Sequence, residues 1–229
     1  MHVCNLGILQ TLNGSLTSLL CEKGFFGGGK LEDQLRELSS RFRSWARVHQ
    51  FQHLQGYITV GMLHMTDGFP ALTCKAWNGQ VLLTFLDSCA SILFQQYPEE
   101  ETELASLASR AMVCWFDRLA RYGRYLTEIE AKDISKFGFT FLTLYQKLGY
   151  FSIIHNCGRW KLLPKHHPFR HVNEDMLSMR VNYRYVHTFK DEDNVGVLKK
   201  LAERVTKGDL MEYRVLCRFL LRLASWQPS

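Results

Sequence analysis

The chain has 229 residues, of which 46% are hydrophobic and 22% charged, so it can bury a hydrophobic core and is not expected to be disordered. No apolar run reaches the roughly 18 residues that a membrane span needs, and the first ten residues lack the layout of a signal peptide, which predicts an intracellular protein without a membrane partner. Seven cysteines without a Cys-x-x-Cys pair are typical of free thiols rather than of a zinc ribbon.

The formal net charge of +6 comes from the C-terminal third of the chain. Residues 159–229 hold 14 Lys and Arg against 8 Asp and Glu, whereas residues 1–158 hold 14 of each. We therefore expect a charge-neutral helical region at 1–158 and a basic C-terminal region at 159–229, together forming one compact unit. Localised positive charge indicates a phosphate-rich partner, although a solvated basic helix face would give the same composition.

Apolar periodicity predicts the first helices. Residues 30–48 place apolar side chains three and four positions apart, as an amphipathic helix does. Residues 74–97 are apolar almost all round and stop before Pro98, which predicts a buried helix. The glutamates at 99–103 suit the positive end of a helix dipole, and a helical pattern follows them to Leu119.

Capping signatures predict two later helices. The sequence TEIE at 127–130 reads as a capping box and opens a helix that runs to about Tyr150. DLME at 209–212 repeats this signature and opens the last helix, which ends near Trp226. Strand patterns are weak by comparison, with 181–189 the best candidate and 56–60 a poorer one. The prediction is a mainly α protein, an irregular helical array with at most two or three short strands.

A glycine-rich segment, GFFGGGK at residues 24–30, has the spacing of a phosphate-binding loop. Leu31 replaces the Ser or Thr that would bind magnesium, and the preceding segment reads as a helix rather than a strand. The segment is therefore interpreted as a flexible connector.

Three histidines lie in the segment WKLLPKHHPFRHV, residues 160–172. His167 and His171 are four positions apart and can share a helix face, where a pair of imidazoles can bind zinc. The general base of an HExxH site is missing, because Pro168 follows His167. The interpretation that we favour gives His166, His167 and His171 structural roles, as packed or hydrogen-bonded imidazoles at a helix start.

The acidic triplet Asp191, Glu192 and Asp193 precedes the sequence NVGVLKK. Carboxylates at a helix N-terminus are favoured by the helix dipole, which is sufficient to explain them. Adjacent helical residues point about 100° apart, so the three cannot all reach one metal ion. One of them could bind magnesium if a second acidic segment supplied further oxygen ligands.

Three segments resemble, in chain order, motifs of CACTA-type cut-and-paste DNA transposases. The start, MHVCNLGILQ, resembles a motif in which an aspartate just before a Met-His pair opens a helix. KLLPKHHPFRHV is similar to their Pro-Lys-x-His segment. DEDNVGVLKK resembles their closing segment, Phe-Glu-Arg-hydrophobic-x-Gly-x-Leu-Lys, which aligns Glu192 with the last acidic residue of a DDE catalytic set and gives Gly196 a structural role.

The resemblance implies an RNase H-like core in which three carboxylates bind two Mg²⁺ or Mn²⁺ ions for phosphoryl transfer. The second aspartate would precede Met1, flanked by His2, and the first aspartate and the central sheet would lie further upstream. Asp191 replaces the usual aromatic residue, so Asp191, Glu192 and Asp193 all remain candidate ligands. Glu192 would bind metal only if the missing segments were supplied, and we expect no metal and no activity for this chain alone.

We accordingly expect a fragment or remnant of a DDE transposase, corresponding to the helical insertion and closing helix and residing in the nucleus. Its basic C-terminal region would bind DNA without sequence specificity, through Lys161, Lys165, Arg180, Arg184, Lys199 and Lys200. The alternative is a helical protein-interaction module whose partner is an acidic protein. The transposase hypothesis also places Glu192 on the first turn of its helix, within roughly 12 Å of a side chain of Met1, His2 or Asn5.

Overall fold

The computed structural model describes residues 7–53, 56–74, 76–186, 199–205, 208 and 210–224. Of the residues that the structure describes, 70% are helical, and they contain one two-stranded antiparallel sheet, which confirms the predicted mainly α fold with few short strands. The chain divides into two units, residues 1–185 and 186–229, which are described separately.

The first unit consists of helices, one hairpin and a short 3₁₀ turn. Its elements in chain order are α1 (Leu9–Glu22), α2 (Leu31–Val48), β1 (Leu63–Thr66), β2 (Phe69–Leu72), α3 (Ala76–Gln96), α4 (Glu100–Arg121), α5 (Glu128–His155), α6 (His166–Met179) and the 3₁₀ turn η2 (Tyr183–Tyr185).

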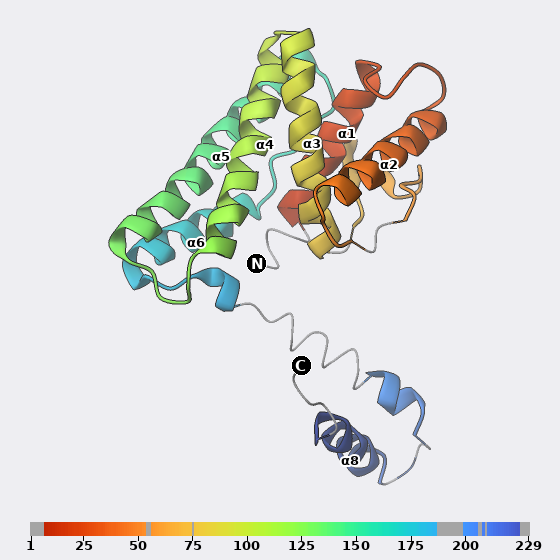
Figure 1. Ribbon diagram of the computed structural model, residues 1–229, viewed down its shortest axis with the longest axis vertical. Coiled ribbons are helices and arrows are strands. Elements are labelled where there is room, and N and C mark those ends of the chain that lie inside the picture. The colour runs from red at the N-terminus through yellow and green to blue at the C-terminus, as the bar shows by residue number, and fades with distance from the viewer. Residues whose placement is uncertain are drawn as a thin grey trace. The chain divides into compact units, whose positions relative to one another are not determined.

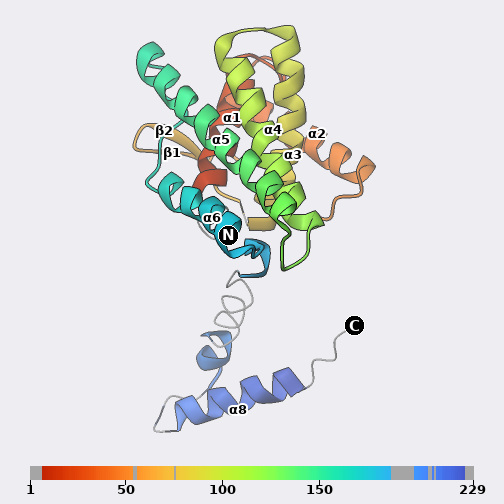
Figure 2. The ribbon, with the colours of Figure 1, turned by 90° about the vertical axis from the view of Figure 1, so that its left-hand side faces the viewer.

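Helix α4 packs between α3 and α5, α6 packs on α5, and α1 packs on both α3 and β2. Figure 1 shows α3, α4 and α5 side by side with α1 and α2 beyond α3, and Figure 2 shows the hairpin beside α1.

Helix α1 is the central element of its half of the unit, since it is buried on nearly all sides. A Cβ atom on Gly14 would lie 2.6 Å from the carbonyl oxygen of Pro70, so only glycine allows β2 to approach this closely. On the α3 side, the Asn13 amide donates to the carbonyl of Gly79 over 3.0 Å. Close backbone contacts therefore tie α1 to both neighbours.

The helices predicted from apolar periodicity and capping signatures are confirmed, and α5 continues past its expected end near Tyr150 to His155. The capping box of α5 is present: Thr127 N–H donates to Glu130 Oε2 over 2.8 Å, and Glu130 N–H donates to Thr127 Oγ1 over 3.3 Å. The glycine-rich segment follows α1, a helix, and positive φ angles at Gly24, Gly27 and Gly29 make it a connector to α2.

The two strand predictions were wrong in their described parts. Residues 56–60 form no strand, and in 181–189 only Val181 makes an isolated bridge, to Tyr125, before η2 begins. The strands instead flank Asp67 and Gly68, whose φ angles of 50° and 80° are those of a tight hairpin turn.

The boundary between the two packed units differs from the boundary between the charge-neutral and the basic region. Residues 159–185 belong to the first unit because Trp160, Phe169 and Met176 are buried in its core. The expected boundary at 158/159 is thus a change in charge, while the change in packing follows Tyr185.

The second unit contains a helical segment at 199–203 and α8 (Met211–Ala224). Among the described side chains of α8, Arg214 and Arg218 are exposed, and so are Tyr213, Leu216 and Leu220. Among the helices of the described ranges, none is both long and apolar enough to cross a membrane.

Candidate nucleic-acid interface

At one end of the first unit, the loop between α4 and α5 lies beside the chain that follows α6. Leu126 N–H donates to the carbonyl of Arg180 over 2.8 Å, and Asn182 N–H donates to that of Arg124 over 2.9 Å. Segments more than fifty positions apart in the sequence therefore form one continuous surface.

The fully buried Asn182 holds this junction together. Its side-chain amide lies 3.0 Å from the carbonyl of Leu119 and 3.1 Å from those of Tyr122 and Gly123. The last carbonyls of a helix have no partner within the helix, so Asn182 acts as a cap for α4. Its Oδ1 accepts the backbone N–H of Arg184 over 3.0 Å, which fixes the start of η2.

Four arginines surround the junction, and we call them the basic end: Arg121, Arg124, Arg180 and Arg184. Arg184 Nη1 donates to the carbonyl of Ala120 over 2.8 Å, at the C-terminus of α4, where the helix dipole favours a cation. Arg180 has a positive φ of 55° just after α6 and forms an ion pair with Glu128 at 3.2 Å.

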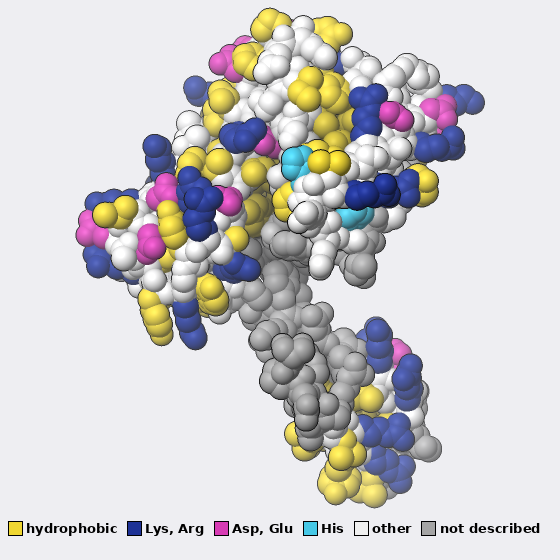
Figure 3. All heavy atoms as spheres, viewed as in Figure 1, with side chains coloured by type: hydrophobic (Ala, Val, Ile, Leu, Met, Phe, Trp, Pro, Cys, Tyr) yellow, Lys and Arg dark blue, Asp and Glu magenta, His cyan; other side chains and the backbone are white. Residues whose placement is uncertain are grey.

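Two tyrosines are exposed among these arginines. Tyr125 is 76% exposed and Tyr185 49%. The guanidinium of Arg124 lies 5.8 Å from the centroid of the Tyr125 ring. Figure 3 shows Lys and Arg side chains around this end of the unit, interleaved with acidic and apolar ones. Arginines suit phosphates, and exposed aromatic rings suit the faces of bases.

Two carboxylates, Glu128 and Asp117, form ion pairs with arginines of the basic end. A hydrogen bond from Lys132, together with the charges of Lys132 and Arg180, holds the pKa of Glu128 below its usual value. Arg121 pairs with Asp117 at 2.9 Å. Exposed pairs of this kind contribute about 0–1 kcal/mol, so exchanging the carboxylate for a phosphate costs little.

Two further residues predicted to bind DNA, Lys161 and Lys165, belong to the first unit but have other neighbours than the basic end. Lys161 forms an ion pair with Asp67 in the hairpin turn. Lys165 precedes α6, and its side chain lies against Gly7, where an added Cβ would meet the Lys165 Cδ at 2.2 Å. In the second unit, Lys199 and Lys200 are exposed.

The three histidines predicted to be structural have two different environments. His166 is packed beside Tyr145, with ring centroids 4.8 Å apart, and burial lowers its pKa. Its Nδ1 lies 3.0 Å from the backbone N–H of Leu163. His167 and His171 are exposed and contact each other.

The acidic triplet Asp191, Glu192 and Asp193, the glycine Gly196 and the start of the chain with His2 lie outside the described residues. The expected approach of Glu192 to the chain start lies there too, and so does the carboxylate that the resemblance assigns to Mg²⁺ or Mn²⁺. Within the part of the chain that the structure describes, no three His, Cys, Asp or Glu side chains are grouped so that they could hold a metal ion.

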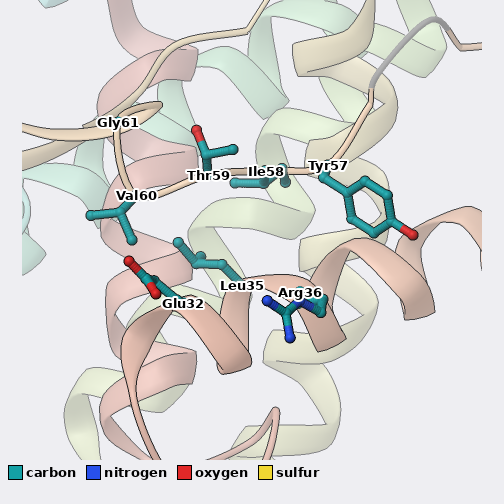
Figure 4. Close-up of a pocket in the computed structure, with 8 residues that line it drawn as sticks. All are labelled: Glu32, Leu35, Arg36, Tyr57, Ile58, Thr59, Val60 and Gly61. Carbon is teal, nitrogen blue, oxygen red and sulfur yellow. The ribbon is translucent and has the colours of Figure 1, made fainter.

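A pocket of about 420 Å³ opens between α2 and the segment 57–61 (Figure 4). Glu32 and Arg36 give its α2 wall both signs of charge, and no His or Cys lines it, so the pocket shows no bias toward phosphate or metal. Its lining residues are Glu32, Leu35, Arg36, Tyr57, Ile58, Thr59, Val60 and Gly61.

Comparisons of the chain with protein-family models, with curated proteins and with solved structures found no match. The sequence singled out Arg180 and Arg184 but not Arg121, Arg124 or Tyr125. The signal that could have pointed to these three residues is the likeness of two sequences, RLARYGRY and RVNYRY, which both alternate arginine and tyrosine. The first of them lies in the charge-neutral region.

Proposed function

We propose that this chain is a remnant of a DDE-type DNA transposase that binds duplex DNA without sequence specificity and performs no chemistry alone. The motif resemblance supports the family. The observation that carries the DNA-binding part is the basic end, where arginines from two distant segments meet around two exposed tyrosines.

Binding of this kind depends on phosphate contacts and therefore on salt. Each phosphate that a Lys or Arg neutralises releases counterions and adds about 0.9 to the slope of log affinity against log salt. Because phosphate contacts carry no sequence information directly, affinity should vary little among duplexes of equal length. The exposed Lys199 and Lys200 would supply further phosphate contacts from the second unit.

The test is a salt titration of binding to a labelled duplex, followed by fluorescence anisotropy. The charge-reversing double variant Arg121→Glu with Arg124→Glu should bind at least tenfold more weakly with a shallower salt slope. Arg36→Glu with Arg47→Glu, on exposed positions of α2, changes the net charge equally and serves as the matched control.

A second charge-reversing variant, Lys199→Glu with Lys200→Glu, should weaken binding uniformly across sequences. The DNA-binding proposal is refuted if both interface variants bind DNA as the α2 control does. If only the lysine variant binds DNA more weakly, Lys199 and Lys200 contact DNA and the basic end does not.

One observation favours the alternative, a helical interaction module. At 100° per residue, Leu216 and Leu220 lie on the opposite side of α8 from Arg214 and Arg218, and all four side chains are exposed. An acidic amphipathic partner would offer carboxylates to the arginines and an apolar surface to the leucines. A polyglutamate peptide of the same charge as the duplex separates the two functions, because the transposase remnant should prefer DNA at equal salt.

A further inference from the structure

Two exposed imidazoles face each other on the first turns of α6. His167 Nε2 and His171 Nε2 lie 3.0 Å apart, and the ring centroids are 4.4 Å apart in an edge-on arrangement. Residues four apart share a helix face, and Pro168 is compatible with the first turn because no intrahelical N–H bond is needed there. The helix itself therefore brings the two nitrogens together.

The separation of the nitrogens suits chelation of one cation. With metal–nitrogen bonds of about 2.0–2.1 Å, nitrogens 3.0 Å apart subtend an angle of roughly 90–100° at the metal. That angle is the one between neighbouring ligands in square-planar and tetragonal sites, which Cu²⁺ and Ni²⁺ prefer. Water would complete the coordination, since both side chains are exposed.

A carboxylate fixes which nitrogen of His171 is free to bind. His171 Nδ1 lies 3.0 Å from Glu174 Oε2, and Arg170 Nε donates to Glu174 Oε1 over 2.8 Å. With one carboxylate oxygen of Glu174 held by Arg170, the other is placed to accept a hydrogen bond from His171 Nδ1–H. In this tautomer the Nε2 lone pair of His171 points at His167, as in the carboxylate–histidine–metal arrangement of natural sites.

We propose that His167 and His171 form a surface chelate for a late first-row divalent cation, with Cu²⁺ bound most tightly and Glu174 acting as a positioning residue for His171. This site is distinct from the Mg²⁺ or Mn²⁺ pair that the resemblance implies, because those ions prefer oxygen ligands. The cation replaces the hydrogen bond between the two rings, and the proton that His167 carries on Nε2 moves to its Nδ1, so that both Nε2 atoms offer a lone pair to the metal. This site is independent of the proposed DNA binding.

The experiment is a Cu²⁺ titration of the full chain by calorimetry, with electron paramagnetic resonance of the loaded protein. The parent protein and all variants carry His2→Gln, because an imidazole next to the terminal amine of the recombinant chain can bind Cu²⁺ itself. His167→Gln and His171→Gln should each weaken Cu²⁺ binding at least tenfold and remove one of two nitrogen couplings from the spectrum.

The matched control is His155→Gln, which removes an exposed imidazole from the last turn of α5 and should leave the affinity unchanged. Glu174→Gln should weaken binding about tenfold while both nitrogen couplings remain. Circular dichroism confirms that each variant is folded. Equal Cu²⁺ affinity of the parent and the His171→Gln variant overturns the chelate, and equal affinity of the Glu174→Gln variant overturns the positioning role.

Discussion

Arg159 and Glu101 form a buried, two-pronged ion pair that joins the segment after α5 to the first turn of α4. Arg159 Nε and Nη2 donate to the two oxygens of Glu101 over 2.8 and 3.0 Å, and both side chains are less than 10% exposed. Trp160 Nε1 donates to the same carboxylate over 2.7 Å. Glu101 therefore holds two consecutive residues, and with them the chain that leads into α6.

The first prediction is that Glu101→Gln destabilises the protein severely. Removing the charge of Glu101 leaves the buried Arg159 with the more exposed Glu22 as its remaining ion-pair partner, so we expect a loss of unfolding free energy toward the lower end of the about 3–5 kcal/mol that breaking a buried pair costs. The control is Glu37→Gln, whose partner Arg41 lies 2.7 Å away on the exposed face of α2. That change should cost less than about 0.5 kcal/mol. Urea unfolding measures both, and equal costs would contradict the assigned importance of the buried pair.

Most of the helices could be predicted because their signals are local. Residues 127–130 carry a capping box, and Pro98 separates α3 from α4. The hairpin was missed although Asp67 and Gly68 form a favoured turn pair, because its flanking strands span only four residues each and do not alternate clearly. Residues 181–186 alternate as a strand would, but the contacts of Asn182 with α4 bend the chain into a turn.

The second prediction concerns the close approach of α5 and α6. A Cβ on Gly138 would lie 2.0 Å from Asn173 Oδ1, which accepts the indole N–H of Trp115 over 2.9 Å. Gly138→Ala gains up to about 1 kcal/mol of helix propensity but displaces the buried Asn173, and overpacking costs about 1–3 kcal/mol.

We therefore expect Gly138→Ala to lower the thermal unfolding temperature. Gly123→Ala is the control, because nothing lies within 4 Å of its added Cβ. A Gly138→Ala protein as stable as the Gly123→Ala control would show that α5 and α6 can separate without penalty.

The third prediction is a pH dependence from Asp87. This carboxylate is buried, and burial raises its pKa despite the ion pair with Arg110 and the hydrogen bond from Ser109. A raised folded-state pKa means that folding favours the neutral acid. The stabilising effect of protonated Asp87 is complete below its pKa in the unfolded chain and is lost as pH rises through its pKa in the folded protein. The lost free energy is about 1.4 kcal/mol for each pH unit by which the two pKa values differ.

Asp87→Asn should consequently stabilise the protein at pH 7, and the gain should shrink as pH falls toward the ordinary carboxyl pKa. Unfolding free energies of the variant and the parent, compared across this range, give the measurement. A variant less stable at pH 7 would mean that the Arg110 ion pair outweighs the cost of burial.

The candidate interface was only half predictable. The charge excess of residues 159–229 led to Arg180 and Arg184, since a local surplus of cations is visible in composition. Arg121 and Arg124 were hidden because acidic residues balance them within 1–158. The backbone hydrogen bonds of Asn182 with Arg124 and of Leu126 with Arg180 bring both pairs together, and no sequence pattern specifies these pairings.

The last prediction tests Asn182 as the residue that builds the basic end. Asn182→Asp preserves the shape of the side chain but replaces an amide donor, directed at three carbonyls, with a buried carboxylate. An uncompensated buried charge costs more than the roughly 1–3 kcal/mol of an unsatisfied neutral group. We expect a loss of about 3 kcal/mol of unfolding free energy at pH 7 and partial recovery in acid, where the protonated carboxyl donates again.

The control is Asn156→Asp, at the exposed end of α5, which should cost less than about 1 kcal/mol of unfolding free energy from the helix dipole. If the basic end binds DNA, Asn182→Asp should also weaken binding at temperatures where the protein remains folded, since Arg184 depends on Asn182 for its position. A variant with normal stability would show instead that the end of α4 is capped without Asn182.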